Sequence, residues 1–555
     1  MAANSAMFQM LLSFSCYLLG ILIIGIFAAR HGRTISAYFL ADRSLGAWVT
    51  AISSVASSES GWVVIGLVGE GYMWGFSAVW AVPGCLLGFL MNWYLIAPRL
   101  RRLAAEKGSI TVPEFLGDMV GDRTHLVRII GVLIIVLCLS GYVAAQFTAC
   151  AKAFRGAFNI PYTYGVLLAG LITVFYTLLG GFRAVSWTDL LQGLLMVAGL
   201  VVLPILAIVH IGGVSPMMEG LKQEPARFSA IFEVTDAQGW HQIKVENEMM
   251  TFGGDPGHTF TLPSVAAGKT VLTISTEYGK VIANAAADAG ISINGSTVSG
   301  RVELAGKELI TLSGISLKFD KTYSMYGGEV LTDTFGKKSA AAAIGWVLGL
   351  LGISLGYPGQ PHVLTRYMAS RDDKTIRVGR VIAIVWGVLA LYGAVVLGHA
   401  ARLILPGIVD PEMAYPLIAV KLLHPLLAGI VLAAILSAMM STADSQILVV
   451  ASAIARDIFH KIFRPEADER TLVMVSRITV FLLGVVSIIV ALKEVRVVFW
   501  FVLLAWSGLG SSFGPPLILS LYWKKLTRAG VVASMITGFA VTIIWKFKLK
   551  AVVQS

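Results

Sequence analysis

The chain has 555 residues, of which 56% are hydrophobic and only 14% are charged, and its mean hydropathy is +0.78. This composition excludes an ordinary soluble globular protein, in which about a quarter of the residues are charged. The formal net charge is +11. In a membrane protein such an excess reports orientation rather than nucleic-acid binding, so we expect no nucleic-acid partner.

Apolar segments of membrane length recur along the whole chain. About 20 apolar residues suffice to cross a bilayer as a helix. We therefore predict an all-α multi-pass protein of the plasma membrane, the inner membrane in a bacterium, whose first partner is the lipid bilayer, and we expect a monomer. Twelve segments qualify as spans: 8–29, 45–73, 78–97, 127–149, 161–180, 188–211, 341–366, 378–403, 428–455, 472–492, 498–522 and 530–547.

The basic residues indicate how the chain is oriented. Residues such as Arg43 and Arg101 lie in the loops after odd-numbered spans, and the positive-inside rule makes those loops cytoplasmic. The N-terminus is then outside. Lys546, Lys548 and Lys550 would also lie outside, against the rule. Either the last segment does not cross the membrane, or a further span is missing.

The composition changes sharply over 213–338. Short alternating runs such as KTVLTISTEYG are broken by glycines, and Asn294-Gly295 is typical of a hairpin turn. We predict a small β-rich extracellular domain over roughly 225–335 in this insertion, with a poorly ordered loop as the alternative. The chain then divides into a membrane bundle with an extra first helix and the first repeat (1–212), the insertion, a second repeat (339–523), and the last helix with the C-terminus (524–555).

Two predicted spans carry helix breakers at matching positions. Span two reads SSVASSESGWVVIGLVG, and span seven reads GWVLGLLGISLGYPGQP. Each opens a run of five spans, so the second run enters the membrane from the opposite side. Matched broken helices predict an inverted-repeat transporter with its site at the bilayer midplane. The alternative is that the glycines only allow close helix packing.

Segment 428–455 carries a polar stripe. Ala438, Ser441, Thr442 and Ser445 fall at i, i+3, i+4 and i+7, and Asp444 borders them. Hydroxyl and carboxylate groups are costly at bilayer depth and usually face a functional site. Oxygen ligands suit a hard cation. The alternative is that the hydroxyls bond only to their own helix, four residues back.

Several strings in the chain resemble the sodium/solute symporter family, most closely its sodium/proline symporters. They are ADRSLGAWVTAISS, SGWVVIGLVG, GGFRAVSWTDLLQ, LGYPGQPHVLTRYMA and ILSAMMSTADSQ. The resemblance covers nearly all of 8–547 except the insertion. It implies a five-plus-five inverted-repeat bundle with flanking helices and no enzymatic activity. The coupling ion would be Na⁺.

The resemblance also implies a main sodium site between spans two and nine. Ala56 and Glu59 would supply backbone carbonyls, and Ala438 a third. Ser441 and Thr442 would supply hydroxyl oxygens. Mostly neutral oxygens suit an ion that must also leave the site readily.

A second cation site is implied nearer the cytoplasm, at Asp189, Asp444 and Ser445. Asp444 stands where some family members have a hydroxyl, which could strengthen a second cation site or favour a proton. The alternative for Asp189 is that it caps the start of a helix.

The substrate pocket is implied by Trp62, Tyr142, Tyr357 and Pro361, which match family positions, and Gln146 lies one turn beyond Tyr142. Aromatic walls suit a small solute with an apolar body. Each aromatic residue taken alone could equally serve helix packing or an interface belt.

Two departures from the proline symporters concern this pocket. Ser58 replaces an aspartate, with Glu59 next to it, and Ile353 replaces a tryptophan. Both residues depart from the pattern of the proline symporters at the substrate pocket. His362 and Arg366, near the cytoplasmic end of span seven, are interpreted as gate or interface residues.

We therefore expect a sodium-coupled symporter that imports a small solute, proline or another amino acid first, by alternating access. One alternative is a proton-coupled carrier of a small organic acid that uses Glu59 and Asp444. Another is a symporter-like membrane sensor, which would carry a long cytoplasmic signalling domain.

Overall fold

The protein is described by a computed structural model. The residues it describes are 2–29, 34–158, 160–223, 229–236, 239–246, 249–254, 259–262, 270–276, 279–285, 292–294, 297–303, 310–312, 315–319, 340–405, 408, 411–493 and 498–546. Lys548, Lys550 and Gly295 of the predicted hairpin turn lie outside these ranges.

The membrane part is helical and falls into two stretches. The first stretch contains α1 (Ala2–Ala29), α2 (Ile35–Leu40), η1 (Ala41–Arg43), α3 (Ala47–Ser58), η2 (Trp62–Leu67), α4 (Val68–Trp74), η3 (Gly75–Trp80), α5 (Ala81–Leu90), η4 (Met91–Ile96), α6 (Ala97–Lys107), α7 (Val112–Met119), α8 (Leu126–Phe158), α9 (Tyr162–Ile211) and α10 (Val214–Gln223). The second contains α11 (Ala340–Leu351), η7 (Gly352–Gly359), α12 (Pro361–Met368), α13 (Asp373–Ile404), η8 (Pro411–Met413), α14 (Ala414–Leu422), α15 (Pro425–Ser452), η9 (Ala453–Phe463), α16 (Glu469–Ala491), α17 (Val498–Tyr522) and α18 (Arg528–Ile544).

In the described part of the chain, eight helices are long and apolar enough to cross a membrane. Three shorter apolar helices, Tyr162–Leu178, Ala343–Gly359 and Arg528–Ile544, account for further predicted spans. The predicted spans five and six run together as α9, with a break at Gly181, whose φ of 58° and ψ of −166° are not helical. A glycine adopts this conformation at little cost.

Both predicted breaks are present. At the first break, α3 ends at Ser58 and Glu59 has φ −93° and ψ 71°. Helical structure resumes in η2. At the second break, α11 gives way to the 3₁₀ turn η7. The chain is extended at Gln360, and a new helix, α12, begins at Pro361. Proline is well suited to a first helical position because it has no amide hydrogen to leave unbonded.

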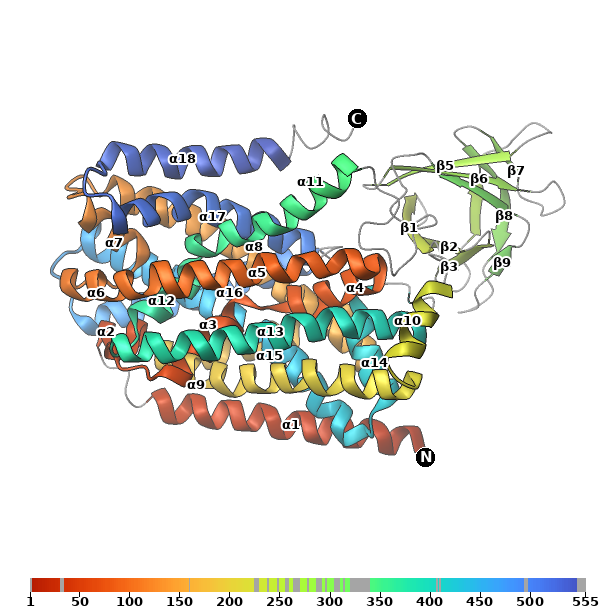
Figure 1. The fold of residues 1–555 in the computed structure, drawn as a ribbon, viewed down its shortest axis with the longest axis horizontal. Helices are drawn as coiled ribbons and strands as arrows, with labels where there is room; N and C mark the ends of the chain where they lie inside the picture. The colour runs from red at the N-terminus through yellow and green to blue at the C-terminus, as the bar shows by residue number, and fades with distance from the viewer. Residues whose placement is uncertain are drawn as a thin grey trace.

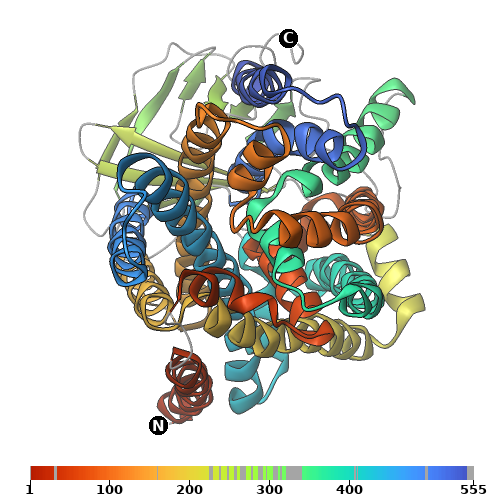
Figure 2. The same ribbon diagram turned by 90° about the vertical axis from the view of Figure 1, so that its left-hand side faces the viewer.

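The long axes of the helices run in roughly one direction, and α1 and α18 lie at the outside of the bundle (Figures 1 and 2). Helix α15 is central: it packs against α9, α8 and α1. In the apolar window of the segment formed by α15 and η9, 78% of the residues are buried, against 17% for α1. The polar stripe therefore lies in the interior of the protein.

The described residues between α10 and α11 form ten strands: β1 (Ser229–Asp236), β2 (Gly239–Glu246), β3 (Met249–Gly254), β4 (Thr259–Leu262), β5 (Thr270–Thr276), β6 (Gly279–Ala285), β7 (Ser292–Asn294), β8 (Thr297–Glu303), β9 (Ile310–Leu312) and β10 (Ile315–Phe319). They pair in the orders β1-β2-β3-β9, β10-β6-β5 and β4-β8-β7. The segments joining them lie outside the described ranges, so a β-rich domain over roughly 225–335 stays a prediction. The first residues of the insertion 213–338 are helical, because α10 covers Val214–Gln223.

The end of the bundle away from the strands carries α2, α6 and α7 (Figure 1). A charged cluster there fixes α7. Glu114 is buried, lies 3.3 Å from both Arg128 and Arg456, and accepts a 2.8 Å hydrogen bond from the Ile110 amide. Burial alone would raise the pKa of Glu114, but Arg456, the Ile110 amide and Arg128 outweigh it and lower that pKa.

Candidate functional site

The end of α3 faces the polar stripe of α15. Ser441 Oγ donates to the Ala56 carbonyl at 3.0 Å, and Thr442 Oγ1 donates to the Ser57 carbonyl at 3.2 Å. Both hydroxyls also lie within 3.2 Å of the Ala438 carbonyl of their own helix. All of these residues are fully or almost fully buried. The structure therefore brings together Ala56, Ala438, Ser441 and Thr442, and Glu59 lies at the adjacent break.

These oxygens fit a monovalent hard cation. They are carbonyl and hydroxyl groups with no formal charge, clustered where α3 loses its regular hydrogen bonding. Because the hydroxyls reach across to a second helix, bonding within their own helix does not account fully for them. Such neutral oxygens can replace the water around a sodium ion without holding it too tightly.

A second buried cluster surrounds Asp189 of α9. Its Oδ2 accepts hydrogen bonds from Ser53 Oγ at 2.6 Å and Ser57 Oγ at 3.4 Å. It also pairs with Arg366 Nη2 at 3.1 Å, and neither charged side chain is exposed. Since Asp189 lies inside α9 and accepts from other helices, it does not cap a helix start.

Asp444 and Ser445 join the same cluster. Ser445 Oγ lies 3.0 Å from Ser57 Oγ, donates to Asp444 Oδ1 at 3.1 Å, and accepts from Arg366. Tyr176 donates a 2.6 Å hydrogen bond to Asp444 Oδ2. The three predicted members of the second site are thus together. Arg366 and Tyr176 are members that sequence reasoning did not place there.

The predicted pocket residues gather at the break after α3. Tyr357 of η7 donates to Glu59 Oε1 at 2.7 Å, and Ser58 Oγ donates to the same oxygen at 3.1 Å. Trp62 Nε1 donates to the Ser58 carbonyl at 3.1 Å. Of the remaining predictions, Pro361 begins α12 close by, whereas Ile353 is only partly buried on η7.

Two residues of α8 meet the same break. Tyr142 Oη lies 3.2 Å from Ser60 Oγ, and Gln146 Oε1 accepts from the Gly61 amide at 3.0 Å. The broken helix is therefore held from α8 as well as from α15 and η7. This arrangement satisfies part of the backbone that the break frees.

A row of rings borders the break. Tyr142 lies 6.1 Å from His362, His362 lies 6.4 Å from Trp506, and Trp506 lies 4.8 Å from Tyr357, measured between ring centroids. Trp506 comes from α17 and was missed in the sequence, because a tryptophan within an apolar span has no distinguishing signal. The row supplies aromatic surface for the apolar part of a solute.

Buried polar atoms without a hydrogen-bond partner in the described structure lie in and around this row, among them Glu59 Oε2, Gln146 Nε2, Trp506 Nε1 and both ring nitrogens of His362. Glu59 Oε2 is an acceptor, Gln146 Nε2 and Trp506 Nε1 are donors, and a neutral imidazole has one donor and one acceptor nitrogen. Buried polar groups are normally bonded, so unbonded ones at a break indicate places for a ligand.

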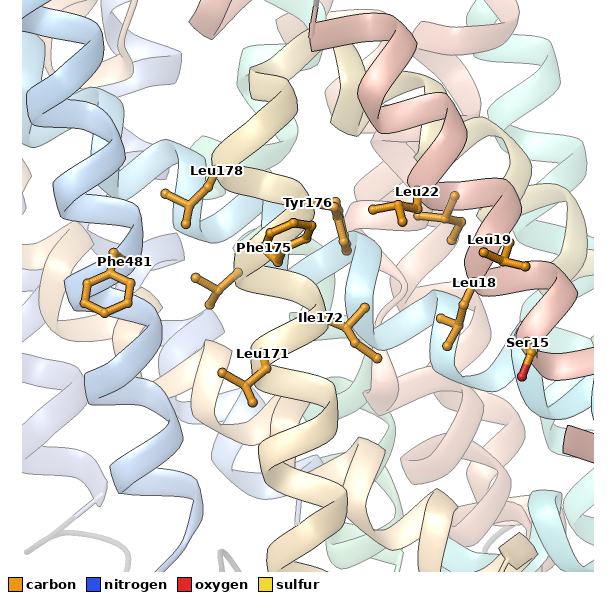
Figure 3. Close-up of a pocket in the computed structure, with 12 residues that line it drawn as sticks. Ser15, Leu18, Leu19, Leu22, Leu171, Ile172, Phe175, Tyr176, Leu178 and Phe481 are labelled. Atoms are coloured by element: carbon orange, nitrogen blue, oxygen red, sulfur yellow. The ribbon is translucent and has the colours of Figure 1, made fainter.

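The cavity drawn in Figure 3 is a different feature. It has a volume of about 710 Å³ and lies between α1, α9 and α16, lined almost wholly by apolar side chains such as Leu18, Phe175 and Phe481. Phe175 and Phe481 are more than half exposed. It is a hollow on the outer surface of the bundle and lacks the polar groups of the site at the break.

Comparisons with known proteins agree with these features. The model of the sodium:solute symporter family matches residues 38–261 and 299–538. The chain is 30% identical to the osmoregulated proline transporter OpuE of Bacillus subtilis, over 97% of this chain and 88% of that protein. It is 31% identical to the high-affinity proline transporter PutP of the same organism, over 94% and 89%.

A sodium/proline symporter of Staphylococcus aureus is 30% identical over 97% of this chain and 86% of its own length. Among solved structures, the substrate-bound outward-open state of a Na⁺-coupled sialic acid symporter has the same fold. Its TM-score is 0.64 at 16% identity, and the match covers 97% of this chain and 96% of that one. The relatives are transporters, so this chain is a multi-pass plasma-membrane transporter and not an enzyme. It belongs to the sodium:solute symporter family.

Proposed function

We propose that this symporter imports proline or a closely related amino acid together with Na⁺, by alternating access. The observation that carries the proposal is the contact of Ser441 and Thr442 with the carbonyls at the end of α3. Relatives that are proline transporters support the substrate class.

We assign the sodium ion to the oxygens of Ala56, Ala438, Ser441 and Thr442, with the backbone of Glu59 completing the set. An ion there would replace the hydrogen bonds that now link the two helices. It would tie α3 to α15 and favour one arrangement of the bundle, which is how a bound ion shifts a conformational equilibrium.

We place the cluster of Asp189, Asp444 and Ser445 on the route by which the ion leaves toward the cytoplasm. Arg366 already bonds two of these residues. A second cation would have to displace its guanidinium group, because two positive charges in one buried site repel each other. We therefore propose one bound sodium ion per cycle.

The architecture that goes with this function is a five-plus-five inverted repeat, with one half beginning at α3 and the other at α11. The matched breaks support it, as do α1 and α18 outside the bundle. We propose that the strand-bearing insertion and the N-terminus are extracellular. The beginning of α1 and the strands lie at one end of the bundle, while the arginine-bearing α6 lies at the other (Figure 1). We propose a monomer.

A second candidate is a proton-coupled carrier of a small organic acid. The observation that favours it is the complete burial of two carboxyl groups, Glu59 and Asp444, inside the bundle. Intramembrane carboxyl groups of this kind form proton relays in other carriers.

Proteoliposomes test both candidates. Uptake of labelled proline is measured with an inward sodium gradient, and separately with an inward proton gradient in the absence of sodium. We expect uptake only with sodium. Thr442→Ala should raise the sodium concentration for half-maximal uptake about tenfold, equivalent to one lost interaction of about 1.4 kcal/mol.

Thr479→Ala is the matched control, because Thr479 is also buried in a membrane helix but bonds only to the Val475 carbonyl of its own helix. Uptake driven by the proton gradient alone would favour the second candidate. Unchanged sodium dependence of uptake in Thr442→Ala would contradict the assignment of the sodium site.

A further inference from the structure

Glu59 is a buried carboxyl group with no charged partner among the described residues. Its side chain is wholly buried, and none of the ion pairs within the described residues involves it. Two neutral donors, Tyr357 and Ser58, bond to Oε1, and Oε2 has no partner. A buried carboxylate is costly unless a positive charge or several hydrogen bonds compensate it.

Two cations in the interior of the described structure have other partners. Arg366 bonds Asp189 and Ser445, and Lys152 lies 2.6 Å from Glu412. The positive group that complements Glu59 Oε2 is therefore expected from outside the chain. In a transporter, a group of this kind at a helix break belongs with the transported solute or ion.

Two unpartnered donors lie in the same neighbourhood. Gln146 is fixed through its Oε1 by the amide of Gly61, two residues after Glu59, so its Nε2 has a fixed position beside the break. Trp506 packs edge-on against Tyr357, whose hydroxyl bonds to Glu59, and its Nε1 has no partner. Donors of this kind suit a carboxylate.

The row of rings, which includes Trp506 and Tyr357, borders the same break and offers apolar contact. One carboxyl acceptor, two donors and an aromatic wall together match a compact zwitterion with an apolar body. They do not match a simple carboxylic acid, which would leave Glu59 Oε2 unpaired and place two carboxyl groups close together, where their ionised forms repel each other.

We propose that the Glu59 side chain receives the ammonium group of the substrate and selects amino acids over carboxylic acids of the same shape, while Gln146 and Trp506 donate to the substrate's carboxylate. This inference rests on the proposed function. It is distinct from the sodium site, which takes only the backbone of Glu59.

The test compares two solutes that differ in one group: L-proline and cyclopentanecarboxylate, in which a methylene replaces the ring nitrogen. Inhibition of sodium-driven proline uptake gives the apparent affinity of each. A site built to bond a polar group rejects an analogue that lacks it, so wild type should prefer proline at least about a hundredfold.

Glu59→Gln should reduce this preference to about tenfold or less. The change should come mainly from a lower affinity for proline, because an amide cannot balance the ammonium charge. Glu59→Asp should retain most of it. Glu70→Gln is the matched control, since Glu70 is a buried carboxyl group on α4, away from the break. The sodium concentration for half-maximal uptake should stay within about twofold of the wild-type value in every variant. This result would also show that each variant is folded.

A second variant tests the opposite end of the solute. Trp506→Phe keeps a ring but removes the N–H, so it should reduce the preference for proline over prolinamide and leave the preference over cyclopentanecarboxylate intact. If Glu59→Gln does not reach the membrane, Glu59→Asp and Trp506→Phe carry the test.

Three results would overturn the inference: an unchanged preference in Glu59→Gln, a change in sodium dependence alone, or a change in pH dependence alone. The last two would make Glu59 an ion ligand or a proton carrier. Absence of sodium-driven proline uptake by wild type is a separate result, which would overturn the proposed function instead.

Discussion

The Tyr357 hydroxyl bonds to the Glu59 carboxyl group at 2.7 Å across 298 residues of chain. Glu59 lies at the break after α3, and Tyr357 lies in η7, the interruption of the second broken helix. One hydrogen bond therefore joins the two interruptions. A solute that bonds to Glu59 acts on both of them, which is what a coupled conformational change requires.

Removing this bond should weaken substrate binding. Tyr357→Phe keeps the ring and its contact with Trp506 but leaves Glu59 without its shortest hydrogen bond. Hydrogen bonds to charged groups contribute about 1.5–3 kcal/mol, so we expect the KM for proline to rise about tenfold or more. Initial rates of uptake in proteoliposomes measure it.

Tyr415→Phe is the control for this variant. The Tyr415 hydroxyl is buried and has no hydrogen-bond partner within the described ranges, so its loss should leave the KM for proline unchanged. Equal effects of the two substitutions would show that Tyr357 acts through packing rather than through Glu59.

The ion pair between Arg366 and Asp189 makes a prediction about stability. Arg366→Met removes the guanidinium group and leaves Asp189 with only the hydroxyls of Ser53 and Ser57. Breaking a buried pair by removing one partner costs about 3–5 kcal/mol. We expect a large fall in the thermal unfolding midpoint of the purified protein.

The double variant Arg366→Met with Asp189→Asn is the informative comparison. It removes the uncompensated charge, so it should be more stable than Arg366→Met alone. A double variant no more stable than the single one would mean that Arg366 acts mainly through its other bonds, to Ser53 and the His362 carbonyl.

The sequence was sufficient to locate the parts of the candidate site that follow local rules. The stripe on α15 could be recognised in the sequence because hydroxyls three and four residues apart share one helix face. The breaks could be recognised because serine, glycine and proline interrupt apolar runs. These signals need no knowledge of neighbouring helices.

What the sequence did not place are contacts set by packing between distant helices. Arg366 looked like a gate residue near a span end, yet it bonds within the cluster of Asp189. Tyr176 and Trp506 lie in apolar spans, where periodicity cannot tell a ligand from a packing residue. The helical start of 213–338, at α10, was missed because composition alone does not resolve a short helix ahead of strands.

Close packing of α13 on α9 makes a prediction about folding. A Cβ atom added at Gly393 would lie 1.8 Å from the Leu200 carbonyl oxygen, too close for any side chain. Gly393→Ala must therefore separate two backbones, at a cost of roughly 1–3 kcal/mol or more. The expected result is little folded protein in detergent by size-exclusion chromatography.

Gly345→Ala in α11 is the matched control, because no atom lies within 4 Å of the added Cβ. It should behave as wild type, or become slightly more stable since alanine favours a helix. Normal folding of Gly393→Ala would show that the contact between α9 and α13 is looser than the structure has it.

The charge cluster at α7 predicts a pH-dependent stability. The pKa of Glu114 is lowered in the folded protein because Arg456, the Ile110 amide and Arg128 outweigh its burial. A carboxyl group with a lowered folded pKa stabilises the protein above its unfolded pKa, about 4.3 for glutamate, and that stability is lost as the pH falls through the folded value.

Glu114→Gln should therefore destabilise the protein by about 1.5–3 kcal/mol at pH 7, and the difference from wild type should shrink as the pH falls below about 4. Thermal unfolding at a series of pH values measures both. Glu106→Gln is the control, because Glu106 is exposed on α6 and pairs with no basic side chain in the described structure. A Glu114→Gln effect that stays constant from pH 7 to pH 3 would mean that the side chain acts through its shape and the bond to Ile110, with no contribution from its charge.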